Sequence, residues 1–465
     1  MIQEKKIDGI WYSLEVNKQE ATVIKSKEEI YNGDIVIPSS FFFEGITYTV
    51  TQIGDSAFEC CEFLTCVDIP ENTLTIGNSA FSGCKGLVSV TGGEKVRYIG
   101  NNAFNNCKRL EIFEIKDGLE VIGNEAFAYC ECLSMEIPPK LQTLGARAFM
   151  HSWLLAIDIP DCLINIDKYA FAECKFDGNI NVDTNNPIYD SREGCNAVIE
   201  SKTDTLIRGS AETIIPKSVR IIGEYSFSDL HYLSSIVIPE GVLRIDDNAF
   251  KNCYRLRAIE IPSTIVSIGY AFTNCCNIDV RINSLEAWCN IEFGCNPLSM
   301  GRRCDGYLQY PTTSSLYING EIVSELTIPS TITSIKDSTF KGCYLESVNI
   351  PNALSSIGNE AFWGCSHITS ILIPKQVTDI GSGAFALCAD LTFVTILGNP
   401  NIQNGAFAGC EGIKDVYCYS DEAPVADKAF GKLDLSKLTL HVPSESVNNY
   451  KETEPWSKFG SIVSI

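Results

Sequence analysis

Residues 350–371 read IPNALSSIGNEAFWGCSHITSI, and this stretch decides the fold because variants of it recur along most of the chain. Its most regular part is an aromatic anchor, usually Ala-Phe, which returns every 22 or 23 residues within three blocks. The anchors are Phe58, Phe81, Phe104, Phe127, Phe149 and Phe171, then Phe227, Phe250 and Phe272, then Phe340, Phe362, Phe385, Phe407 and Phe430. A fixed period of this length predicts a solenoid, in which each unit buries its apolar side chains by stacking on its neighbours.

Each part of the unit has a physical role. Alternating residues such as Val348-Asn349-Ile350 predict a strand with two side chains turned inward and one outward, and the following Pro351 ends it because proline lacks the N–H that a ladder needs. The anchor Phe and the Leu or Ile six residues later are expected to fill the interior. The glycine four residues before Phe predicts a tight turn, which should be looser in the units that lack it. Those units carry Asp167, Asp246, Lys336, Gln403 and Ala426.

The pattern resembles the BspA-like, or Treponema pallidum-type, leucine-rich repeats, and the flanking segments resemble that family as it occurs in Bacteroidetes. The resemblance covers most of residues 50–430. It implies an α/β repeat of the β-rich kind: one right-handed leucine-rich repeat solenoid with a parallel β-sheet on its concave face and β-rich terminal caps. We expect a cap over residues 1–50, a solenoid over 51–430 and a second cap over 431–465, with variant coils at about 175–212 and 279–325.

Charge and hydropathy exclude some partners. The chain has 36 Lys+Arg against 58 Asp+Glu, a net charge of −22, which argues against nucleic acid as a ligand. The first eight residues carry charges where a signal peptide needs an apolar run, and no stretch is long and apolar enough to span a bilayer. We therefore expect no transmembrane segment in this sequence.

Eleven of the 21 cysteines share one position, three residues after the anchor Phe. They are Cys61, Cys84, Cys107, Cys130, Cys174, Cys253, Cys275, Cys343, Cys365, Cys388 and Cys410. A position shared by so many units predicts a buried structural slot, in which free cysteine packs as a small hydrophobe. Cys289, Cys295 and Cys304 are close enough in sequence to consider zinc, but they match no paired Cys-x-x-Cys spacing, so we expect no metal and no cofactor.

Catalytic signatures are missing from the sequence. The chain has four histidines, and His151, His231 and His367 fall at loop positions that unrelated residues fill in other units. A nucleophile would therefore lack an obvious base, and neither a phosphate-binding loop nor a zinc-protease motif occurs. We expect that the protein is not an enzyme; a hydrolase acting on host glycans or peptides is the weakest alternative.

The outward strand positions form a row of candidate binding residues. By register the row includes Asp68, Glu114, Glu136, Asp158, Glu260, Arg281 and Tyr417, and its N-terminal half is acidic. One interpretation is a surface for a basic or extended protein ligand. The other is that the carboxylates keep an exposed sheet soluble and unpaired. Trp153 and Trp363 fall at predicted loop positions, where each either anchors a partner or packs between adjacent coils.

The resemblance implies a non-catalytic protein-binding scaffold at the cell surface or secreted, similar to an adhesin, whose partner is a protein such as an extracellular matrix or host surface protein. A cytoplasmic location is the alternative. A second function class is a structural spacer or assembly module without a ligand of its own.

Overall fold

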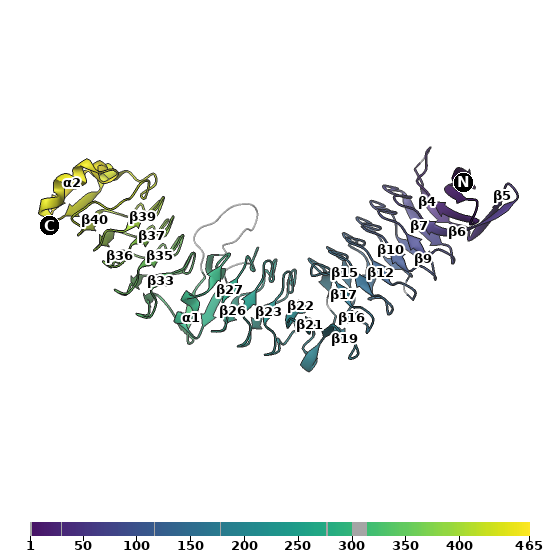
Figure 1. Ribbon diagram of the computed structural model, residues 1–465, viewed down its shortest axis with the longest axis horizontal. Helices are drawn as coiled ribbons and strands as arrows, with labels where there is room; N and C mark the ends of the chain where they lie inside the picture. The colour runs from purple at the N-terminus through teal and green to yellow at the C-terminus, as the bar shows by residue number, and fades with distance from the viewer. Residues whose placement is uncertain (1, 29, 116, 177, 276–277, 300–313) are drawn as a thin grey trace. The chain divides into compact units, whose positions relative to one another are not determined.

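The computed structural model describes the whole chain except residues 1, 29, 116, 177, 276–277 and 300–313 (Figure 1). The chain forms two compact units, Met1–Leu230 and His231–Ile465. Each is a β-solenoid built from the same kind of coil, with mostly parallel strands and little helix, and the described residues form about 17 turns in total. The predicted repeat fold is confirmed.

Each regular coil contributes two strands, where the sequence pattern had predicted one. The first strand ends at the Ile-Pro pair. The second is a two-residue strand, such as β8 (Thr75–Ile76), that ends just before the glycine found in most of the repeats. Equivalent strands of successive coils pair in parallel, so each unit contains an Ile-Pro sheet and an Ile-Gly sheet. The sequence pattern did not predict the second strand because only one of its two side chains points inward, so no alternation of apolar and polar residues is visible.

The N-terminal unit has the following strands. Its Ile-Pro sheets contain β4 (Gly33–Val36), β7 (Leu64–Ile69), β9 (Ser89–Gly92), β11 (Ile112–Phe113), β13 (Ser134–Met135), β15 (Trp153–Leu154), β16 (Ile157–Ile159), β18 (Lys175–Phe176) and β19 (Ile180–Val182). Its Ile-Gly sheet contains β6 (Ile46–Ile53), β8, β10 (Tyr98–Ile99), β12 (Val121–Ile122), β14 (Thr143–Leu144) and β17 (Asn165–Ile166). The antiparallel strands β1 (Ile2–Ile7), β2 (Ile10–Glu15) and β3 (Glu20–Val23) extend this sheet beyond β6, and β5 (Ser40–Phe43) pairs with β6. The unit ends with β20 (Tyr189–Asp190), η1 (Arg192–Gly194), β21 (Ala197–Glu200), β22 (Thr205–Gly209) and β23 (Ile221–Ile222).

The C-terminal unit repeats this arrangement. Its Ile-Pro sheets contain β24 (Ser235–Val237), β26 (Ala258–Ile261), β28 (Asp279–Ile282), β30 (Leu316–Ile318), β31 (Glu321–Ile322), β32 (Glu325–Thr327), β34 (Ser347–Asn349), β36 (Ser370–Ile373), β38 (Phe393–Ile396), β40 (Asp415–Cys418), β41 (Thr439–Val442) and β42 (Ser461–Ser464). Its Ile-Gly sheets contain β25 (Arg244–Ile245), β27 (Ser267–Ile268), β29 (Glu292–Phe293), β33 (Ser334–Ile335), β35 (Ser356–Ile357), β37 (Asp379–Ile380) and β39 (Asn401–Ile402). Short helices are α1 (Leu285–Cys289), η2 (Pro297–Ser299), η3 (Leu435–Lys437), η4 (Ser444–Ser446), α2 (Val447–Glu452) and η5 (Trp456–Lys458).

The proline turns follow the prediction. Strand β7 stops at Ile69, and the carbonyl of Pro70 accepts a hydrogen bond from the amide of Thr73 at 3.0 Å. The same turn occurs in other coils; for example, the amide of Leu354 donates a hydrogen bond to the carbonyl of Pro351 at 3.0 Å. Proline therefore ends the strand and its carbonyl fixes the turn that leads to the next sheet.

The core is a column of anchor rings. Phe58, Phe81, Phe104 and Phe127 are fully buried and stack nearly parallel, with ring centroids 4.9, 5.0 and 5.3 Å apart. In most coils, the arc that carries the ring has left-handed residues two positions before and after it, such as Asn102 (φ 56°) and Asn106 (φ 62°) around Phe104. The segment is therefore an irregular arc.

The repeated glycine has a different role from the predicted one. Gly77, Gly100 and Gly123 are not left-handed, but a Cβ on Gly100 would lie 2.7 Å from the amide nitrogen of Asn78 in the preceding coil. Glycine is needed because adjacent backbones approach closely. The prediction of a looser turn is wrong at Asp167 and Gln403. Their amides donate hydrogen bonds to carbonyls of the preceding coil at 3.0 and 2.9 Å, close to the 2.8 Å of the equivalent hydrogen bond from Gly100.

We expect Gly100→Ala to destabilise the N-terminal unit by about 1–3 kcal/mol, because the added methyl group pushes apart two backbones that cannot move independently. Urea unfolding of the variant beside the unchanged chain measures this. An unchanged midpoint would show that the coils relax without cost.

A ladder of Asp and Asn side chains, which the sequence analysis missed, follows these glycines. Asp55 Oδ1 accepts from the amide of Asn78 at 2.7 Å, Asn78 Oδ1 from Asn101 at 2.8 Å, and Asn101 Oδ1 from Asn124 at 2.7 Å. The same hydrogen bond occurs in the C-terminal unit, where the amide of Asn359 donates to Asp337 Oδ1 at 2.7 Å. Each side chain thus satisfies an amide of the next coil and fixes the spacing between coils.

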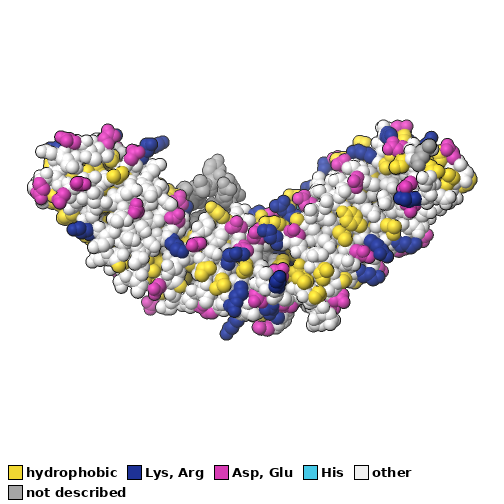
Figure 2. Space-filling view, viewed as in Figure 1, with side chains coloured by type: hydrophobic (Ala, Val, Ile, Leu, Met, Phe, Trp, Pro, Cys, Tyr) yellow, Lys and Arg dark blue, Asp and Glu magenta, His cyan; other side chains and the backbone are white. Residues whose placement is uncertain are grey.

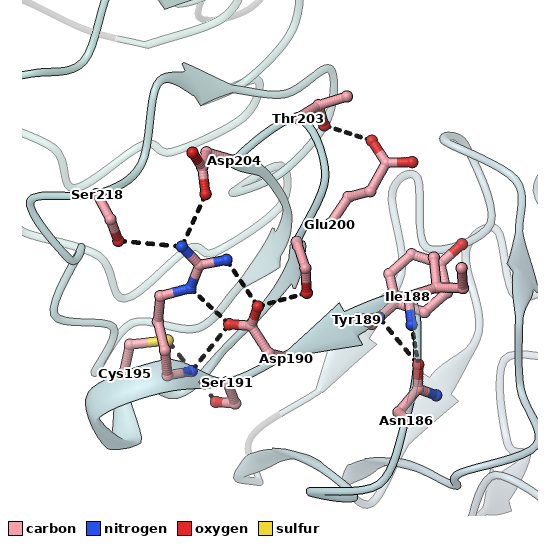
Figure 3. A network of polar contacts seen from close by, with 12 residues as sticks. Asn186, Ile188, Tyr189, Asp190, Ser191, Cys195, Glu200, Thr203, Asp204 and Ser218 are labelled. Carbon is pink, nitrogen blue, oxygen red and sulfur yellow. Dashed lines mark hydrogen bonds and ion pairs between the residues drawn. The ribbon is translucent and has the colours of Figure 1, made fainter.

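Two arginines stabilise the stretch that interrupts the anchor register between Phe171 and Phe227. Arg192 binds Asp190 through Nε and Nη2, both at 2.7 Å, and Asp204 through Nη1 at 2.7 Å (Figure 3). Arg208 is fully buried. The first network closes the β20–β21 connection at the surface, whereas Arg208 occupies the core.

Candidate binding face

The ladder thiols are structural groups. All eleven predicted positions are buried, and every cysteine in the described part of the chain is free of a disulfide. Several thiols donate to the carbonyl of the anchor Phe one coil earlier: Cys84 to Phe58 at 3.0 Å and Cys107 to Phe81 at 3.1 Å. The slot therefore selects a small donor as well as a small volume. Ser152 fills it in one coil and donates to the Phe127 carbonyl at 2.5 Å. Of the three cysteines considered for zinc, Cys304 lies outside the described residues.

Burial makes these thiols poor nucleophiles. It raises the pKa of Cys61 to about 11 and that of Cys174 and Cys343 to about 12, because the thiolate loses its hydration inside the solenoid. Reactivity at neutral pH is correspondingly low, which agrees with the structural interpretation.

We expect a loss of stability in alkali. The folded pKa of Cys343 lies above its unfolded value of about 9, so its contribution is complete below pH 9 and is lost as the pH rises toward 12. Over this range the free energy of unfolding should fall with pH more steeply in the unchanged chain than in Cys343→Ser, by about 1.4 kcal/mol per pH unit. The serine variant keeps a hydrogen-bond donor but has no thiol that titrates. Urea unfolding at pH 9 and pH 10 checks the slope; equal slopes for the two proteins would contradict it.

The histidines pack between coils. Each lies against a tyrosine ring, with ring centroids 4.8 Å apart for Tyr129–His151, 5.2 Å for His231–Tyr254, 4.4 Å for Tyr344–His367 and 4.2 Å for Tyr417–His441. Three also contact a carboxylate: His151 with Glu173 at 2.9 Å, His367 with Asp390 at 3.3 Å and His441 with Asp415 at 2.8 Å. These contacts indicate that the histidine side chains serve in packing between coils.

In the N-terminal unit, four predicted outward residues lie on or directly after strands of the Ile-Pro sheets, and all four are exposed. We call Asp68, Glu114, Glu136 and Asp158 the acidic row. Asp68 lies opposite Thr91 in register and accepts from its hydroxyl at 3.2 Å, and Asp158 accepts from Asn181 at 2.7 Å. The predicted outward orientation is therefore what the strands show.

The acidic row lacks the ion pairs that some nearby carboxylates form. Several carboxylates elsewhere in this unit pair with cations of adjacent coils, as in Lys85–Glu62 at 2.6 Å, Arg97–Glu120 at 3.2 Å and Lys108–Glu131 at 2.9 Å. Within the described residues, no member of the acidic row forms an ion pair with Lys or Arg. The row thus presents negative charge that the protein itself leaves uncompensated.

In the C-terminal unit, the predicted residues occupy two different settings. Glu260 and Arg281 are exposed neighbours on β26 and β28, and the Arg281 guanidinium lies 5.8 Å from the Tyr317 ring. Tyr417 is half-buried and stacks on His441 with an interplanar angle of 8°. The former pair is open to solvent, whereas the latter is partly used in packing.

The two tryptophans differ from each other. Trp153 lies on strand β15 with 40% of its surface exposed, so the predicted loop position is wrong; the coil is one residue shorter there and the strand pairs earlier. Trp363 packs between coils, with Lys341 Nζ 4.8 Å from its ring. The surface shown in Figure 2 has hydrophobic side chains in small separate groups among charged ones.

A sequence profile described as the BspA type leucine rich repeat region, with six copies, matches residues 51–177, 209–291 and 314–450. The chain belongs to this family. The matched residues make up more than half of the chain and contain all the anchor phenylalanines. Members of the BspA-type leucine-rich repeat family are generally non-catalytic scaffolds for protein interaction.

The chain is similar to several solved structures, of which the first supports the fold. A leucine-rich repeat protein from Bacteroides ovatus is 21% identical, with a TM-score of 0.52, and the match covers 94% of this chain and 99% of that one. A leucine rich cell surface protein from Faecalibacterium prausnitzii is 23% identical over 90% and 95% of the two chains, with a TM-score of 0.45. A leucine-rich repeat protein from Eubacterium ventriosum is 22% identical over 83% and 95%, with a TM-score of 0.46. No curated protein matches the chain.

Neither a metal-binding cluster nor a membrane-spanning helix occurs among the residues that the structure describes. No group of three or more His, Cys, Asp or Glu side chains is arranged to hold a metal ion. No helix is long and apolar enough to cross a membrane.

Proposed function

We propose that this BspA-type protein is a non-catalytic scaffold of the cell surface or of the secreted fraction, which binds a basic surface of a partner protein through the acidic row. The observation that carries the proposal is that four exposed carboxylates recur at the outward position of the Ile-Pro strands, and within the described residues none of them forms an ion pair with Lys or Arg. Some carboxylates beside the row, such as Glu62, Glu120 and Glu131, do pair with cations of neighbouring coils. An extracellular matrix or host surface protein fits this role, as in an adhesin, and the cell-surface description of the Faecalibacterium protein supports the location.

Rigid strands make the row suitable for recognition. Asp68 and Asp158 are fixed by hydrogen bonds to Thr91 and Asn181, so a partner need not order them on binding. Charges held in this way steer encounters with a basic partner and lose their effect as salt rises. A salt-sensitive protein interaction is therefore the expected behaviour.

The test uses the full chain immobilised against extracellular matrix, plasma and mucin proteins at low and high salt. Replacing Glu114, Glu136 and Asp158 together with lysine should weaken capture of a salt-sensitive partner about tenfold, because three exposed pairs contribute about 0.2–1 kcal/mol each. The matched control replaces three exposed carboxylates outside the row, Glu71, Glu94 and Asp161, with lysine.

Equal capture by both variants would remove the acidic row from the binding face. Capture of no partner by the unchanged chain would favour the structural spacer instead.

A further inference from the structure

The Ile-Pro sheet of the C-terminal unit is interrupted between two consecutive strands. Strand β31 folds back on β30 through a two-residue turn at Asn319 (φ 52°) and Gly320 (φ 88°), and it ends a five-stranded sheet. Strand β32 then starts a separate two-stranded sheet with β34. Two strand edges therefore stand next to each other in the chain without being paired together.

The hydrogen bonds already present show which backbone groups face outward from these edges. Val323 donates to Leu316 across the β30–β31 hairpin at 2.8 Å, so the intervening Ile322 directs its N–H and C=O away from β30. On β32, the Ser324 carbonyl accepts from Glu346 at 2.7 Å and Ile328 donates to Asn349 at 3.0 Å.

Alternation along β32 follows from these contacts. In β32, the backbone groups of every second residue point toward β34, as those of Ser324 and Ile328 do. The residues between them, Glu325 and Thr327, therefore direct their N–H and C=O groups to the opposite edge. Both residues are exposed. Within the described residues, the open edges are thus those of Ile322 on one strand and of Glu325 and Thr327 on the next.

These edges line one groove. A cavity of about 500 Å³ has Ile322, Glu325 and Thr327 in its wall, together with Leu285 from α1. The Ile322 side chain is 55% exposed and Leu326 is buried at 2%. The groove therefore combines unpaired backbone edges with an apolar contact, which is what an added strand uses.

Charge selects the occupant. Glu321 and Glu325 line the cavity, and among the described residues its lining includes no lysine or arginine and neither carboxylate forms an ion pair. The segment 321–327 also has no proline or lysine, residues with which proteins commonly block strand edges. The two glutamates repel acidic strands and attract basic ones.

We propose that this groove binds an extended basic peptide segment of a partner protein by β-strand addition between β31 and β32. The added strand hydrogen-bonds to both edges and places basic side chains beside Glu321 and Glu325 and an apolar side chain on Ile322. This site is separate from the acidic row and goes beyond the function proposed for it.

The experiment measures binding of a fluorescent, end-blocked heptapeptide that alternates lysine and valine to the full chain. Thr327→Pro removes an edge N–H that β34 does not use and should weaken binding about tenfold, whereas Thr327→Val keeps it and should bind within about twofold of the unchanged chain. Glu321→Lys combined with Glu325→Lys should also weaken binding about tenfold. Amide hydrogen exchange over residues 321–328 should slow when the peptide is bound.

A second arm leaves the protein unchanged in case Thr327→Pro disturbs the coil. The same peptide N-methylated at its valines loses the donors along one edge and should bind at least about tenfold more weakly. Equal binding of the methylated peptide, absence of binding by the unmodified one, or loss of binding in the Glu114, Glu136 and Asp158 lysine variant would overturn the proposal. The last result would place the peptide on the acidic row.

Discussion

Replacing Arg208 with methionine should lower the free energy of unfolding of the N-terminal unit by about 3–5 kcal/mol. The side chain is fully buried, and Nη2 donates to the Cys174 carbonyl at 2.8 Å while Nη1 donates to the carbonyls of Tyr225 and Ser228, both at 3.1 Å. Its guanidinium also lies 5.1 Å from the Phe176 ring. Methionine fills much of the volume but leaves these buried carbonyls without their donor, at about 1–3 kcal/mol each.

Urea unfolding followed by hydrogen exchange in β22 and β23 measures this loss within the unit concerned. Arg208→Lys should show an intermediate loss, because one ammonium group cannot reach carbonyls on both sides as the planar fork does. The control is Arg97→Met, since the Arg97 side chain is 66% exposed and its single ion pair contributes little. A loss for Arg208→Met no larger than that of the control would show that water replaces the guanidinium.

Phe104→Ala should cost about 3–5 kcal/mol, because it opens a cavity in the middle of the ring column. The Phe104 ring stacks on Phe81 at 5.0 Å and on Phe127 at 5.3 Å, and the edge of Phe113 meets it at 5.3 Å. Each coil is stabilised mainly by its neighbours, so the hydrogen exchange of the adjacent coils should increase first.

The matched control is Phe63→Ala, because the Phe63 ring is 76% exposed and its removal should change stability by less than about 0.5 kcal/mol. Thermal and urea unfolding of the two variants test the contrast. Similar losses from both would mean that the anchor column is not the main source of stability.

Much of the fold could be read from local patterns. The spacing of the phenylalanines predicted stacked coils, the Ile-Pro pairs predicted where strands end, and strand alternation predicted that Asp68 and Asp158 face outward. These features depend on residues within one coil and its exact repetition, so the sequence contains all the information that they need.

The candidate site was only partly predictable. The sequence identified an acidic row but gave no information on its pairing, since an ion pair such as Lys85–Glu62 joins residues 23 positions apart. Arg208 was missed although its side chain points inward on β22 like that of the buried Leu206; a charged residue at an inward strand position is the signal that identifies it. The groove between β31 and β32 has no sequence signal at all.

The sequence by itself determined the repeat, the inward column of rings and thiols, and the outward rows, because each follows from side chains that alternate or recur along the chain. Only the tertiary structure decided why glycine precedes the Asp and Asn ladder, which carboxylates remain uncompensated and where a sheet is interrupted. Those properties depend on how closely one coil approaches the next, and that distance is set by the packing of whole coils rather than by any single stretch of residues.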